Sequence, residues 1–239
     1  MPHFFSNRQR SHALVPRAGN RGLHFRWETA NAMVYTAGGV IFIAGSVCFF
    51  PSLSAWQDLG AGAFLAGSLL YLLVTGHDMV EVVACHRQRG WKRSVWSVLE
   101  FWAAVSYLVG TLLFVGGSVC FFPEIGWAGP GAWSFLVGSA LFLFGAVVNV
   151  LQIVFAATMK TLQLLNLTAI SFIVGSTLFC VASIPFLWDL RSEADRLLLD
   201  GYLAWLFLSG SVLFLAGGLL NYWRAWLVVR SASQAEASA

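Results

Sequence analysis

The residue types that could do chemistry lie near the ends of three apolar segments. Each segment carries two polar residues three positions apart: Asp78 and Glu81, Asn149 and Gln152, and Asn221 and Arg224. Residues at i and i+3 share one face of a helix. Polar groups at membrane depth are costly and usually face a bundle interior or a water-filled cavity. If the segments surround one axis, the six groups form a polar collar in which Arg224 faces Asp78 and Glu81.

The collar has two interpretations, and both stay open at this point. It could bind an ion or a small solute. Alternatively, these residues mark where helices meet lipid headgroups, or their amides bond helices together. His77 and His86 flank Asp78, but their spacing matches no zinc or di-iron pattern. We therefore expect no metal, no catalytic residue and no cofactor other than lipid.

The chain contains an internal repeat. Residues 45–51, Gly-Ser-Val-Cys-Phe-Phe-Pro, recur unchanged at 117–123, which is 72 positions later. A second motif, Phe-Leu-x-Gly-Ser, begins at residues 64, 135 and 207. Repeats of this kind define the architecture of a chain. The sequence therefore consists of three copies of a unit with two apolar segments.

The composition is that of a membrane protein. The chain is 58% hydrophobic and 10% charged, whereas soluble domains are about 25% charged. Six stretches approach the ~20 apolar residues that crossing a bilayer requires; they lie at about 30–50, 59–77, 100–122, 130–157, 162–187 and 201–223. Long apolar runs form helices in lipid because the backbone must bond to itself. We predict an all-α polytopic membrane protein with six transmembrane helices arranged as three parallel helical-hairpin repeats, either around a pseudo-threefold axis or in a row.

The distribution of positive charge predicts the orientation. Of the 14 lysines and arginines, all but Arg191 and Arg196 fall on the side of the two termini. The positive-inside rule therefore places both termini in the cytoplasm. Cys48 and Cys120 lie near the other face, at equivalent repeat positions. Free thiols are the simpler interpretation for them, and a disulfide is the alternative.

Each predicted helix carries one pair of small residues, and small residues also recur every seven positions. The pairs are Gly45-Ser46, Gly67-Ser68, Gly117-Ser118, Gly138-Ser139, Ala182-Ser183 and Gly210-Ser211. Seven residues make two helical turns, so each set lines one stripe along which helices can approach closely. We assign these stripes to helix packing, with a permeation path as the alternative. We expect phenylalanine to face lipid, and Trp102 and Trp205 to pack between helices.

The two-helix unit resembles the YrhK-like domain of bacterial membrane proteins. The resemblance rests on the Phe-Leu-x-Gly-Ser motif and on the polar position about ten residues beyond it. It implies a small integral membrane module and transfers no catalytic residues. We divide the chain into a basic cytoplasmic arm (1–26), repeat 1 (27–97), repeat 2 (98–160), repeat 3 (161–230) and a flexible tail (231–239).

These features predict a non-enzymatic integral membrane protein of the bacterial inner membrane. We expect an accessory or structural subunit of a larger membrane complex, in contact with lipid and not with nucleic acid. The alternative is a small-solute or ion transporter or channel, with the collar at the cytoplasmic ends of the second, fourth and sixth helices. A redox enzyme that binds quinone or haem is a third hypothesis, and it would require a chromophore.

Overall fold

The computed structural model describes residues 21–89, 95–122, 124–151, 158–188 and 192–237. These residues form helices and no strand. The long helices are α1 (Arg21–Cys48), α2 (Gln57–Arg89), α3 (Val95–Cys120), α4 (Ala128–Val150), α5 (Met159–Ser183) and α6 (Glu193–Ala237). Two short 3₁₀ helices, η1 (Pro51–Trp56) and η3 (Ile184–Leu187), follow α1 and α5. Among the described residues, six helices are long and apolar enough to cross a membrane, which confirms the predicted class.

Some boundaries differ from those expected. Helix α4 ends at Val150, although the apolar run continues to residue 157, and residues 152–157 lie outside the described part of the chain. Helix α6 continues to Ala237, so most of the segment that we expected to be a flexible tail is helical. The 1–26 arm is described only from Arg21, where α1 begins. Cys48 and Cys120 are free thiols and form no disulfide.

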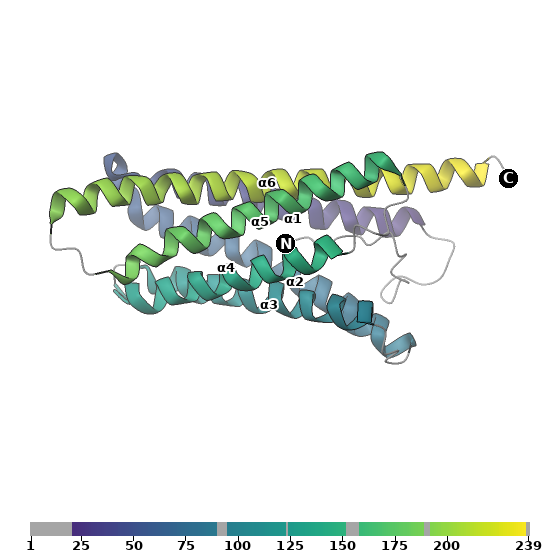
Figure 1. Ribbon diagram of the computed structural model, residues 1–239, viewed down its shortest axis with the longest axis horizontal. Helices are drawn as coiled ribbons and strands as arrows, with labels where there is room; N and C mark the ends of the chain where they lie inside the picture. Colours follow the sequence, from purple (N-terminus) through teal and green to yellow (C-terminus); the bar gives the residue numbers. More distant parts are fainter. Residues whose placement is uncertain (1–20, 90–94, 123, 152–157, 189–191, 238–239) are drawn as a thin grey trace.

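The six helices close into a ring. Each helix packs against the helices before and after it in the sequence, and α1 also packs against α6. Figure 1 shows the helices running side by side along the long axis of the molecule. The Ser46 and Ser211 hydroxyl oxygens are 3.2 Å apart across the α1–α6 contact, and the Tyr35 hydroxyl donates to the Phe214 carbonyl at 3.1 Å. The arrangement is therefore a ring and not a row.

Aromatic side chains fill the axis of this ring. Aromatic residues recur every seven positions, for example Tyr35, Phe42 and Phe49 on α1 and the turn after it, so they share one helix face. Equivalent positions in the three repeats contribute one ring each to five layers: Phe49/Phe121/Phe186, Phe64/Phe135/Phe207, Phe42/Phe114/Phe179, Tyr71/Phe142/Phe214 and Tyr35/Tyr107/Phe172.

The rings of different repeats touch across the axis. Ring centroids are 5.7 Å apart between Phe114 and Phe179 and 5.9 Å apart between Phe64 and Phe207. Four of the five layers, all except Phe49/Phe121/Phe186, are buried. Every side chain in these four layers is at most 4% exposed. Our expectation that phenylalanine faces lipid is therefore wrong for these positions. Trp102 and Trp205 do not pack between helices either, because they are 54% and 60% exposed on the outside of the ring.

Glycine makes room for these rings. A Cβ atom on Gly45 would lie 2.8 Å from the Phe64 ring, and one on Gly210 would lie 2.6 Å from the Phe179 ring. In each case the ring comes from the other helix of the same hairpin and crosses the glycine on its way to the axis. Backbones also approach closely here, since a Cβ on Gly138 would lie 3.0 Å from the Gly110 carbonyl oxygen. The glycine stripes thus act as seats for aromatic side chains.

We predict that Gly138→Ala destabilises the bundle, whereas Gly116→Ala does not. The new methyl group at 138 would meet the Phe114 ring at 2.8 Å and a backbone oxygen that cannot move freely. Overpacking of this kind costs about 1–3 kcal/mol. At Gly116 a methyl group meets nothing within 4 Å, so the helix propensity of alanine leaves stability unchanged or slightly higher. Thermal unfolding in detergent measures the stability of both variants. Equal unfolding midpoints would contradict the conclusion that Gly138 makes room for the Phe114 ring.

Candidate functional site

A buried polar layer lies beyond the aromatic layers, at the end of the ring where α1 begins and α6 ends, which we call the terminal end. Asp78, Asn149 and Asn221 follow Tyr71, Phe142 and Phe214 by seven residues, so the aromatic stripe of each even helix continues into a polar residue. These three side chains are 8%, 1% and 5% exposed. Arg224, one turn further along α6, is fully buried at 0%.

The amides of the second and third repeats are held by different partners. The Asn149 side-chain amide donates to the Tyr107 hydroxyl at 2.8 Å, which joins α4 to α3. Arg224 donates from Nε and Nη2 to the Asn221 Oδ1 atom at 3.3 and 3.1 Å, within α6. Buried polar groups are costly unless they are bonded. These contacts therefore fix the orientation of both amides.

The first repeat contributes the acidic side of the layer. On the outer side of Asp78, the Asn31 amide contacts His77 Nδ1 at 3.0 Å, and His77 Nε2 lies 4.0 Å from Glu81 Oε1.

The potential ligand atoms of His77, Asp78 and Glu81 lie within 4.8 Å of one another. Imidazole and carboxylate are groups that bind divalent metals. The three residues come from one helix, and Asn31 already engages the imidazole. Our expectation that no metal binds here stays a prediction.

Four of the predicted collar residues are buried, namely Asp78, Asn149, Asn221 and Arg224, and two of them, Asn221 and Arg224, are in contact. That all six form one collar stays a prediction. Glu81 is only partly buried and lies beside His77. Gln152 lies outside the described residues. Tyr107 and Asn31 were not predicted as part of the site from the sequence. A signal for Tyr107 was available, because it stands 72 positions after Tyr35 in the repeat.

The small-residue pairs are all buried in helix interfaces. The hydroxyls of Ser46, Ser118 and Ser183 donate to carbonyl oxygens four residues earlier, at 2.8, 2.8 and 2.7 Å. Gly45, Gly117 and Gly210 lie under aromatic rings of the partner helix. The remaining members are buried as well: Gly67, Ser68, Gly138, Ser139, Ala182 and Ser211.

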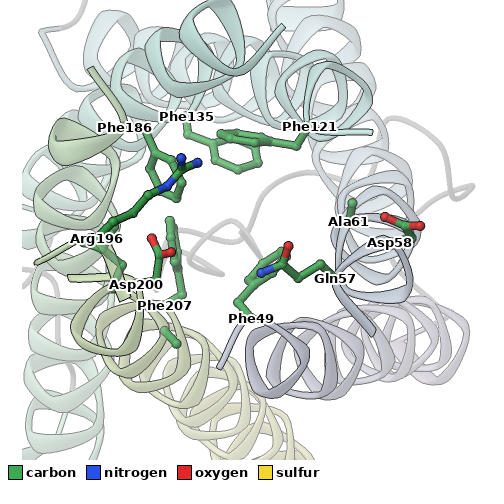
Figure 2. Close-up of a pocket in the computed structure, with 12 residues that line it drawn as sticks. Phe49, Gln57, Asp58, Ala61, Phe121, Phe135, Phe186, Arg196, Asp200 and Phe207 are labelled. Carbon is green, nitrogen blue, oxygen red and sulfur yellow. The ribbon is translucent and has the colours of Figure 1, made fainter. Parts of the chain in front are cut away.

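A cavity opens at the opposite end of the ring, where the two helices of each hairpin connect; we call this the hairpin end. The cavity, which we call the vestibule, has a volume of about 200 Å³. Figure 2 shows phenylalanine rings from all three repeats around it, with Arg196 and Asp200 reaching toward it from α6. Below the vestibule, a small space of about 10 Å³ lies between aromatic rings, next to Ser68 and Thr111.

The family comparison agrees with the repeat. The family model described as YrhK-like protein matches residues 25–83 and again residues 97–154. The chain therefore belongs to the YrhK-like family through its first two repeats. The third repeat is not matched, but it supplies its own ring to every aromatic layer and Asn221 to the polar layer. Comparisons with the curated proteins and with the solved structures gave no match.

We predict energetic coupling between Asp78 and Arg224. Both are buried, and if the two charges compensate each other, removing one leaves the other in a medium of low dielectric, which costs about 3–5 kcal/mol. Asp78→Asn and Arg224→Met should each destabilise the bundle, and the double variant should lose less than the sum. Unfolding of the four proteins in a denaturing detergent measures this. Additivity within about 0.5 kcal/mol would contradict the coupling.

Proposed function

We propose that the chain is a non-enzymatic, non-conducting accessory or structural subunit of a larger complex in the bacterial inner membrane. One observation carries this proposal, namely that aromatic rings fill the axis of the ring. An open permeation path through a helical bundle needs a continuous water-filled space along its axis. Here rings of different repeats lie within about 6 Å of one another along the axis.

The shape of α6 supports the accessory role. The helix has 45 residues, which at 1.5 Å per residue gives ~67 Å, about twice the hydrocarbon thickness. Figure 1 shows its last turns running past the ends of the other described helices. On this part of α6, the Arg230 guanidinium lies 5.0 Å from the centre of the Trp226 ring, and Arg230 is exposed. An exposed cationic and aromatic helix face suits a partner protein or anionic headgroups.

Transport of a small solute or ion is the second candidate. The buried layer of Asp78, Asn149, Asn221 and Arg224 favours it, because ionisable residues at membrane depth often belong to transport pathways. The vestibule lies on the same axis at the other end. Conduction would require the aromatic layers between them to separate, which makes this candidate a gated transporter and not an open channel.

We predict that the chain purified from its host in mild detergent carries a larger membrane protein in fixed stoichiometry. A chain shortened after Leu227 should lose that protein but keep its unfolding midpoint, because this change removes the last turns of α6 and spares the ring. Native mass spectrometry of both proteins is the measurement. In parallel, ion and solute flux into liposomes containing the chain should not exceed flux into empty liposomes.

Two results would count against the accessory role. One is a full-length chain that purifies alone at the mass of 26.1 kDa. The other is saturable uptake into liposomes that is lost in Asp78→Asn, which would favour transport instead.

A further inference from the structure

The vestibule combines an aromatic floor with polar groups at its rim. Phe49, Phe121 and Phe186, one from each repeat, lie at the level where the ring of helices opens. Phe135 and Phe207 form the deeper wall and are buried. A volume of about 200 Å³ is smaller than the roughly 300–1,000 Å³ typical of sites for drug-sized molecules. The vestibule therefore suits a solute about the size of a single amino acid.

The charged groups that face the vestibule balance each other. Arg196 and Asp200 are four residues apart and so lie on one face of α6. Figure 2 shows both side chains extending toward the central space, with Gln57 beside Phe49, whereas Asp58 points away from it. One guanidinium and one carboxylate thus face the cavity.

Both charged groups are accessible. Arg196 is exposed and Asp200 is partly buried. A second hollow of about 200 Å³ lies against Trp188 and Pro185, and it shares Arg196 and Asp200 with the vestibule. A ligand in the vestibule can therefore reach both groups.

We propose that the vestibule binds a small zwitterionic solute with an apolar body, of the class of free amino acids with aromatic or large aliphatic side chains. Arg196 would bind the carboxylate, since its planar fork matches two carboxylate oxygens. Asp200, one turn deeper on α6, would bind the ammonium group. The phenylalanine floor would cover the apolar side chain. A ligand with only one charge would leave either Arg196 or Asp200 without a counter-charge, so the lining selects a molecule that carries both.

The proposal is tested by binding of L-phenylalanine to the full chain in nanodiscs, measured by titration calorimetry. Phenethylamine lacks the carboxylate and 3-phenylpropionate lacks the ammonium group, so each should bind roughly tenfold to a hundredfold more weakly. Arg196→Gln and Asp200→Asn should each lower the affinity for L-phenylalanine by a similar factor. The matched control is Arg87→Gln, which removes an exposed arginine from the far end of α2 and should leave the affinity unchanged.

The comparison of the three ligands needs no variant, so it stands even if a substitution impairs folding. Saturable binding of L-phenylalanine with the expected losses would support the site. No binding at millimolar ligand to a chain with an intact unfolding transition would overturn it. If phenethylamine or 3-phenylpropionate bound as tightly as L-phenylalanine, the roles given to Arg196 and Asp200 would be overturned. Because the readout is binding and not assembly, failure here is distinguishable from failure of the accessory role.

Discussion

The seating of aromatic rings on glycine is the contact on which the rest of the structure depends. In a bilayer, helices gain little from the hydrophobic effect, because lipid is as apolar as leucine, and close packing must take its place. Here the glycine of one helix lets the ring of its hairpin partner cross to the axis, as at Gly45 and Phe64. Aromatic pairs in such arrangements contribute about 0.5–1.5 kcal/mol beyond the area they bury. Five threefold layers of these rings join the three hairpins.

Much of this architecture could be predicted from the sequence. The repeat of residues 45–51 at 117–123 and the long apolar runs define the helices, the hairpins and the class of the protein. The direction in which phenylalanine points could not be obtained from composition, because a phenylalanine is equally acceptable to lipid and to a protein core. The spacing did hold a signal. Phe64, Tyr71 and Asp78 are seven residues apart, so the polar residue marks the inward face and the aromatic residues share it.

The candidate site was predictable only in part. Aligning the repeats identified Asp78, Asn149 and Asn221 as equivalent, and all three are buried in the structure. The partners of these residues depend on side-chain direction across helices, so the bond between Asn149 and Tyr107 could not be predicted from spacing. The vestibule was missed because its lining comes from all three repeats at the point where each hairpin turns. The sequence did carry one signal for the vestibule. Repeat 3 departs from the repeat pattern by having charged residues, Arg196 and Asp200, at the start of α6.

The aromatic axis, the buried polar layer and the vestibule exist only if repeat 3 returns to repeat 1 and closes the ring of helices. The most direct test is disulfide formation in the variant Ser46→Cys/Ser211→Cys, with the native cysteines replaced by serine or alanine. The two hydroxyl oxygens are 3.2 Å apart between α1 and α6, so mild oxidation should crosslink the pair within a single chain. Efficient crosslinking inside one chain is the result that the ring predicts. Its absence, with crosslinks only between chains, would place the hairpins in a row and contradict the account.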